Sequence, residues 1–244
     1  MTGHEDSGSA EVARGERLHV FTRVLQEKIR AHERATRHLN QYLSVEFNVF
    51  DYIGVGETAL SRVLRDLLDP SGAHGQGATF LAAFLRKCGL SIQLPNDKVS
   101  TRVQDEMRTA NIDAADRRID LVIEIGDLRI GIENKPYARD QQDQVLAYSQ
   151  DLSYKNPDAW YLVYLTPDGR PPSEYSVPSH LAAKYRASGR LIELSYAKDI
   201  AEWLAECIRE CISDKYRWFL RDLHVALENA FAPHAPALED RREH

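Results

Sequence analysis

The chain has 244 residues, of which 43% are hydrophobic and 28% charged, and its formal net charge is -6. This composition is too apolar for a fully disordered chain. No apolar run reaches the roughly 18 residues that a membrane-spanning helix needs, and the first residues lack the apolar stretch of a secretory signal. Three cysteines do not make a disulfide framework, so we expect a reduced, cytoplasmic protein with no membrane contact. The negative charge argues against a nucleic-acid coat protein but permits a nucleic-acid enzyme that carries acidic residues for metal.

The N-terminal part of the chain is predicted to be a tail followed by one long helix. Residues 1–13 have little to bury, so we expect disorder there. Residues 14–45 are predicted to form a basic amphipathic helix with the apolar stripe Leu18, Phe21, Leu25 and Ile29. Seven basic side chains stand against three acidic ones in this segment. The helix is therefore either a solvated charged surface or a contact for phosphate or for a partner, including a second copy in a homodimer.

The remaining segments are predicted to fold as an α/β domain over residues 46–231, followed by a loose tail at 232–244. Hydrophobic periodicity and turn residues predict helices near 57–69, 77–88, 139–153, 197–211 and 214–231. They also predict strands near 98–105, 159–166 and 190–196, and a hairpin over 118–135. Turn-forming residues over 166–179 predict a loop. This order of elements favours a mixed central sheet covered by helices.

The hairpin has a register that follows from its turn. Gly126 and Asp127 suit a two-residue type II′ turn, which places Ile125 opposite Leu128. Counting outward predicts one apolar face and one charged face. The apolar face would hold Ile119, Leu121, Ile123, Ile125, Leu128, Ile130 and Ile132. The charged face would hold Asp120, Glu124, Arg129, Glu133 and Lys135, with Glu124 opposite Arg129 as an ion pair.

The same register places Asp120 directly opposite Glu133. Two carboxylates in this relation lie roughly 5 Å apart and repel each other, at a cost on the order of 1 kcal/mol in water and more when buried. A divalent cation between them would remove the conflict, and Lys135 projects from the same face. Two carboxylates, a metal and a lysine match metal-assisted phosphodiester hydrolysis. The alternative is an exposed strand face on which Lys135 simply neutralises Glu133.

These residues resemble the pattern of the PD-(D/E)XK nuclease superfamily. Asp120 matches its first acidic position, although Ile119 stands where a proline is often found, and Glu133-Asn134-Lys135 matches Glu-x-Lys. Five further blocks resemble one uncharacterised bacterial branch of that superfamily: 67–81, 117–124, 132–148, 161–169 and 194–204. The resemblance spans roughly residues 46–212 and implies a restriction-endonuclease-like αβββαβ core with a mixed sheet, flanked here by the long N-terminal helix and the C-terminal helices.

The resemblance also implies an activity and a set of site residues. The expected activity is that of a Mg²⁺-dependent endonuclease, with Mn²⁺ able to substitute, that cuts nucleic acid and by family preference DNA. The implied metal ligands are Asp120, Glu133, the backbone carbonyl of Asn134, and Glu57 at the start of a helix. Lys135 would position the water or stabilise charge, and Gln144 would hydrogen-bond a metal water or a phosphate. The bacterial branch suggests a role in defence against phages or mobile elements.

Three further residues are secondary candidates, and Tyr148 and His74 each have a structural alternative. Gln141 lies three residues before Gln144 and is expected on the same helical face. Tyr148, four residues after Gln144, is either part of the site or a half-buried packing residue. His74 lies in a glycine-flanked loop, where it would serve as acid, base or ligand, or only hydrogen-bond the backbone. For the whole chain the alternatives are a catalytically silent nuclease-fold module in nucleic-acid binding or assembly, and a helical interaction protein.

Overall fold

The computed structural model describes residues 6–44, 47–94, 101–109 and 117–231. The chain divides into two compact units, Met1–Asn48 and Val49–His244. The predicted tail at 232–244 lies outside the described residues, as do residues 1–5. Each unit is described by itself below.

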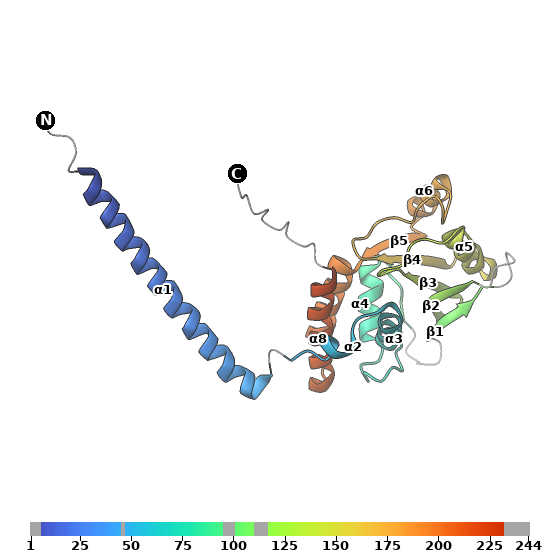
Figure 1. Cartoon of the computed structure of the whole chain (residues 1–244). Coiled ribbons are helices and arrows are strands. Elements are labelled where there is room, and N and C mark those ends of the chain that lie inside the picture. The colour runs from blue at the N-terminus through green and yellow to red at the C-terminus, as the bar shows by residue number, and fades with distance from the viewer. Residues whose placement is uncertain (1–5, 45–46, 95–100, 110–116, 232–244) are drawn as a thin grey trace. The chain divides into compact units, whose positions relative to one another are not determined.

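The first unit contains one long helix, α1 (Asp6–Leu43), drawn in blue in Figure 1. The helix begins eight residues before the predicted start, so residues 6–13 are helical where disorder was expected. Large apolar side chains of α1 are exposed: Leu18, Val20, Phe21, Val24, Leu25, Ile29, Leu39, Tyr42 and Leu43.

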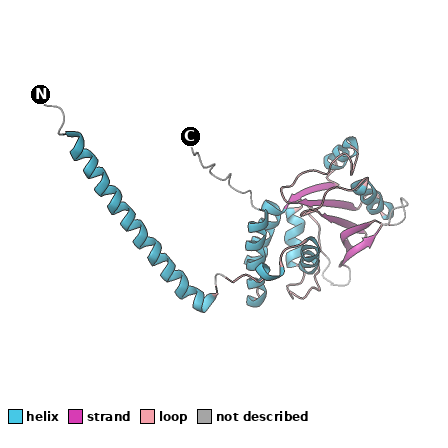
Figure 2. Ribbon diagram, viewed as in Figure 1, coloured by secondary structure: helices cyan, strands magenta, loops and turns pink. Residues whose placement is uncertain are grey.

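The second unit is built on a five-stranded mixed sheet (Figure 2). Its strands are β1 (Thr101–Arg108), β2 (Arg118–Ile125), β3 (Leu128–Asn134), β4 (Trp160–Thr166) and β5 (Leu191–Ser195), and they lie in this spatial order. β1, β2 and β3 pair antiparallel, whereas β3, β4 and β5 pair parallel. The expected mixed sheet is therefore confirmed. Residues 98–100 of the first predicted strand lie outside the described residues, and the strand runs three residues further than expected.

Helices cover both faces of the sheet (Figure 1). One face packs on the larger apolar core, to which five helices contribute: α2 (Phe50–Ile53), α3 (Glu57–Leu68), α4 (Thr79–Lys87), α7 (Ala201–Glu210) and α8 (Asp214–Phe231). The other face packs on α5 (Gln144–Lys155) and α6 (Ser179–Ala187). A π-helical turn, η1 (Tyr196–Ile200), joins β5 to α7. Because both faces of the sheet are covered, successive residues of β2 and β3 are buried on one face or the other, and both strands are apolar along most of their length.

The register of the hairpin is confirmed from Leu121 opposite Ile132 to Ile125 opposite Leu128, but the ladder ends there and the predicted pair of Asp120 and Glu133 is not part of it. Ile125 pairs with Leu128 and Glu124 with Arg129, as the turn predicted. The faces have one exception. Ile119 was expected beside Leu121, but it packs in the opposite core with Val122. The strand pair is distorted at this point, because Glu106 of β1, which stands across from Asp120, has a left-handed φ of 48°. The side-chain alternation therefore breaks at Asp120.

The helices α5 and α6 differ from the prediction. The helix expected from residue 139 begins only at Gln144, after Asp143 in a left-handed conformation with φ of 51°. A left-handed residue cannot continue a right-handed helix, so the preceding residues form a turn. The helix α6 follows the expected loop at 166–179 and was not predicted, since Ala182 is the one side chain that it buries fully.

Candidate active site

The two acidic residues of the hairpin converge at a buried point. The Asn134 amide N–H donates to Oδ2 of Asp120 at 2.7 Å, which ties the carboxylate of β2 to the end of β3. Glu133 is 1% exposed, and its Oε1 pairs with Nζ of Lys135 at 2.7 Å. The second oxygen of Glu133, Oε2, is buried and has no hydrogen-bond partner among the described residues. A buried, unpaired carboxylate oxygen is costly unless a cation or a proton serves it.

Desolvation makes both carboxylates hard to ionise, and the charge of Asp120 adds to this effect at Glu133. Burial, partly offset by the Asn134 N–H, raises the pKa of Asp120 to about 6. Burial and the charge of Asp120 raise the pKa of Glu133 to about 8, although Lys135 acts in the opposite direction. Glu57 adds to the repulsion at both groups. The single positive charge of Lys135 therefore does not balance the three carboxylates of Asp120, Glu133 and Glu57, and a divalent cation fits such an environment.

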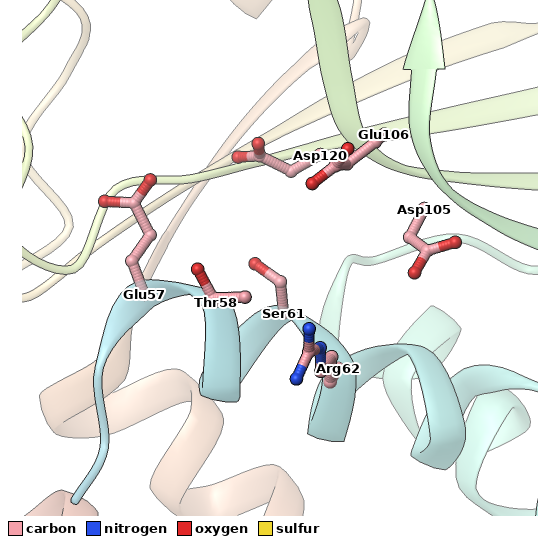
Figure 3. Close-up of a pocket in the computed structure, with 7 residues that line it drawn as sticks. All are labelled: Glu57, Thr58, Ser61, Arg62, Asp105, Glu106 and Asp120. Carbon is pink, nitrogen blue, oxygen red and sulfur yellow. The ribbon is translucent and has the colours of Figure 1, made fainter.

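Glu57 reaches the same region from helix α3. It is the first residue of that helix and is exposed, and it shares with Asp120 a pocket of about 520 Å³. The pocket is also lined by Thr58, Ser61, Arg62, Asp105 and Glu106. Figure 3 shows the carboxylates of Glu57 and Asp120 at one end of this pocket, with the hydroxyls of Thr58 and Ser61 turned toward it. The pocket thus joins acidic groups from β1 and β2 to a polar face of α3.

Asn134 has a second set of contacts that the sequence did not reveal. Its side chain is fully buried, donates from Nδ2 to Oγ of Ser61 at 2.9 Å, and accepts from the hydroxyl of Tyr196 at 2.7 Å. Ser61 lies one helical turn after Glu57, so helical spacing puts it on the same face of α3 as that candidate but does not indicate its contact with Asn134. Nothing in the sequence pattern connects Tyr196 to this point, because η1 lies 62 residues away along the chain.

Gln144 and Tyr148 form a buried pair next to the acidic centre. Nε2 of Gln144 donates to the Tyr148 hydroxyl at 3.0 Å, while Oε1 of Gln144 is buried without a described partner. The Tyr148 hydroxyl in turn donates to the backbone carbonyl of Arg118. Burial and the nearby charge of Glu133 raise the pKa of Tyr148, which keeps it neutral. Both residues therefore lie in the immediate surroundings of Glu133.

Two secondary candidates are not brought to this centre. Gln141 is exposed in the turn before α5, so it does not share a helical face with Gln144 as expected. His74 is buried between the rings of Phe80 and Tyr216, and its ring nitrogens contact the backbone of Asp69 and Gln76. The contacts described for His74 are those of a residue that shapes its loop.

The donors at the centre fit a hydrated metal ion. Within the described ranges, no group of three or more His, Cys, Asp or Glu side chains is arranged so that it could hold a metal ion. A cation such as Mg²⁺, however, is usually held by one or two carboxylates and keeps several waters. Asp120 and Glu133, with the unpaired Oε2, match that smaller requirement.

A mixed sheet with Asp120 on β2, Glu133 on β3 and the buried Lys135 directly after β3 is the arrangement that the sequence resemblance implied. The family model of the PD-(D/E)XK nuclease superfamily matches residues 47–220. The chain belongs to this superfamily, whose members typically use divalent metals. The resemblance noted in the sequence is thereby confirmed, as is the fold class that it implied.

The other comparisons add no closer relative. No curated protein and no solved structure matches the chain. Among the described helices, none combines the length and the apolar character needed to cross a membrane.

Proposed function

We propose that this protein is a metal-dependent endonuclease that hydrolyses phosphodiester bonds of nucleic acid. The observation that carries the proposal is the convergence of Asp120, Glu133 and Lys135 in a buried centre of a chain that belongs to a nuclease superfamily. A purely structural ion pair between Glu133 and Lys135 does not account for the second acid, the half-buried Asp120, or for the unpaired Oε2 of Glu133. A bound cation accounts for both.

In this proposal Asp120, Glu133 and the backbone carbonyl of Asn134 hold Mg²⁺, with Mn²⁺ as a substitute. When bound, the cation supplies Lewis acidity to a phosphate oxygen and acidifies a water. Asp120 and Glu133 contribute the negative charge, and their ionisation becomes favourable in the presence of the cation. Glu57 holds a second metal or its water from the rim of the pocket.

Lys135 and Gln144 act on the water and the phosphate. The ion pair between Nζ of Lys135 and Oε1 of Glu133 supports this role, because it holds the ammonium group in one position next to a proposed metal ligand. There it orients the attacking water or stabilises the charge that develops on phosphate. The free Oε1 of Gln144 is an acceptor for a proton of a water bound at the centre. Tyr148 holds the amide of Gln144 in place through its hydroxyl.

DNA is the proposed substrate, and the family assignment is its main support. The pocket is wide enough at about 520 Å³ to admit a nucleotide. Arg62 and the hydroxyls of Thr58 and Ser61 would supply donors for a phosphodiester from the α3 side of the pocket, across from the acids of β1 and β2 (Figure 3). We further propose, on the resemblance to a bacterial branch, a cytoplasmic role in defence against phages or mobile elements. Three buried, unpaired cysteines suit a reducing compartment.

Two copies of the chain are proposed to associate through α1. The helix carries residues at alternating steps of four and three, a seam defined here as Leu18, Thr22, Leu25, Ile29, His32, Thr36, Leu39 and Leu43. Its five apolar members are between 46% and 67% exposed. A seven-residue repeat is the pattern of a coiled coil, and a helix this long with an exposed stripe needs a partner for stability. Lys28 and Glu33 flank the seam at the spacing at which a parallel, in-register pair would bring them together.

Cleavage of labelled DNA with a Mg²⁺ titration tests the proposal. We expect the wild-type protein to cut only with metal, and Glu133→Gln and Lys135→Ala to lose at least about 100-fold in rate. Asp127→Asn removes one negative charge from the exposed turn of the same hairpin and serves as the matched control. Wild-type protein that binds DNA without cutting it at any Mg²⁺ or Mn²⁺ concentration would favour the alternative, a catalytically silent binding or assembly module.

A further inference from the structure

The side chain of Asn134 connects three elements at the edge of the acidic centre. It extends from the last residue of β3, between Glu133 and Lys135. Its Nδ2 donates to Ser61 Oγ at 2.9 Å and lies 3.5 Å from the Glu57 carbonyl oxygen, both in α3. Its Oδ1 accepts from the Tyr196 hydroxyl of η1 at 2.7 Å. Both ends of one fully buried amide are thus used to join β3 to α3 and to η1.

These hydrogen bonds fix the position of α3 along its own axis, which its apolar packing does not fix. Leu60, Leu64 and Leu67 bury the inner face of α3 against the core, but apolar burial is not directional and tolerates small sliding of a helix along its axis. Hydrogen bonds lose strength steeply with distance and angle. The contact with Ser61 therefore sets the axial position of the first turn of α3 relative to the end of β3.

Glu57 depends on this position. It is the first residue of α3, and its exposed side chain lines the pocket together with Asp120 (Figure 3). Since the carboxylate of Glu57 is exposed, its distance from Asp120 and Glu133 is set by where the helix begins. A shift of the first turn would move Glu57 while leaving the two strand carboxylates in place, because Asp120 is tied to the backbone N–H of Asn134 rather than to its side chain.

We propose that Asn134 is a positioning residue whose side-chain amide, through Ser61 and Tyr196, places Glu57 for joint binding of a divalent cation with Asp120 and Glu133. This role rests on the proposed function. It is distinct from the backbone carbonyl of Asn134, which the Glu-x-Lys resemblance already implies as a ligand. A substitution of the side chain leaves that carbonyl in the chain.

A double-mutant cycle on the full-length protein tests this role, with Mn²⁺ binding measured from the electron paramagnetic resonance signal of free Mn²⁺. Asn134→Ala and Glu57→Gln are each expected to weaken Mn²⁺ binding about tenfold, the usual scale for groups that orient metal ligands. The double variant should bind no more weakly than the weaker single variant, because Asn134 acts through Glu57. Losses that multiply to about 100-fold in the double variant would overturn the proposal.

Ser61→Ala provides the same test if Asn134→Ala does not fold. It removes only the contact to α3 and should likewise have no effect once Glu57→Gln is present. Val63→Ala, a change elsewhere on the same helix, controls for a general loosening of α3, and it should leave Mn²⁺ binding within about twofold of wild type. If the wild-type protein binds Mn²⁺ and cleaves DNA but the effects in both double-mutant cycles are additive, the positioning role of Asn134 is wrong and the proposed function stands. Wild-type protein that binds no Mn²⁺ would overturn it together with the proposed function.

Discussion

At the scale of single residues, Asp120 and Glu133 are the groups through which the fold responds to pH. Their pKa values rise from ordinary values of 3.8 and 4.5 to about 6 and about 8, because both lose solvent on folding and because the charge of Asp120 acts on the buried Glu133. A raised pKa means that the folded state binds more protons than the unfolded chain between about pH 4 and pH 8. The contribution of these acids to stability is therefore full below about pH 4 and is lost as pH rises through their folded pKa values.

The expected result is that the metal-free protein loses stability from pH 5 to pH 8, on the order of a few kcal/mol. Urea unfolding at a series of pH values, with a chelator present, measures this slope. Glu133→Gln, which cannot ionise, should flatten the slope over the same range. Added Mg²⁺ should raise the unfolding midpoint more at pH 8 than at pH 5, since only the ionised acids bind it. Equal slopes for wild type and Glu133→Gln would show that this centre does not control the pH dependence.

Arg62 and Arg65 allow a matched comparison on one helix. Arg62 lines the pocket beside Thr58 and Ser61, whereas Arg65, three residues on, is within 3.8 Å of Asp105. We expect Arg62→Gln to weaken DNA binding and to reduce the salt slope by about one, the signature of a lost phosphate contact. Arg65→Gln should change both quantities much less. Fluorescence anisotropy of labelled DNA over a salt series, with Ca²⁺ in place of Mg²⁺, measures both; similar effects of the two variants would argue against a specific role of Arg62.

The residues of the site were predictable to different degrees. Asp120, Glu133 and Lys135 lie on a hairpin whose turn fixes the register, so counting along the sequence placed them together. Ser61 and Tyr196 come to Asn134 from elements 73 and 62 residues away, and no local rule gives such contacts. The prediction for Gln141 was wrong because a single left-handed residue, Asp143, delays the start of α5. The sequence around Asp143 contains no pattern that requires a left-handed conformation there.

At the scale of elements, the seam of α1 has a consequence that cross-linking can measure. In a parallel, in-register pair, each seam residue faces the same residue of its partner. Leu25→Cys is therefore expected to form a covalent dimer under mild oxidation, seen on a non-reducing gel. The native cysteines do not compete, since Cys88, Cys207 and Cys211 are buried.

Glu27→Cys is the matched control, because residue 27 lies on the side of α1 away from the seam. Equal cross-linking of the two variants would indicate random collision rather than a defined pair. Reversing the charge with Lys28→Glu should weaken the dimer, and adding Glu33→Lys should restore it. An antiparallel pair whose seams overlap from Leu18 to Leu43 would place residue 25 opposite residue 36 and leave Leu25→Cys without a cross-link, which would contradict the parallel orientation.

The prediction of elements succeeded where the hydrophobic periodicity agrees with the residues that end helices or form turns. α8 spans the predicted residues 214–231, and the hairpin strands end at the predicted turn of Gly126 and Asp127. α6 was missed because its burial is slight, so the sequence carries no strong apolar stripe there. The break of alternation at Asp120 could not be foreseen either, because it arises where β1 and β2 are distorted together around Glu106. Local patterns thus predict regular elements, while distortions next to the site depend on tertiary contacts.

At the scale of the whole molecule, the chain divides into two compact units, Met1–Asn48 and Val49–His244, and these units differ in what they contain. The second unit contains both apolar cores and every residue of the proposed catalytic centre. A domain of this size buries enough apolar surface to fold alone. The first unit contributes one helix with an exposed seam.

We therefore expect the fragment 49–244 to unfold in one cooperative transition, to be monomeric by light scattering, and to retain Mg²⁺-dependent cleavage of short DNA. The full chain should be a dimer under the same conditions. Ile29→Glu in the full chain is the control that keeps α1 but places a charge in its seam, which a dimer would have to bury. If this variant is monomeric and cuts short DNA as well as the fragment does, α1 acts only by pairing two copies. If the fragment fails to fold while Ile29→Glu folds normally, α1 is needed for the fold of the nuclease domain and the division into two independent units is wrong.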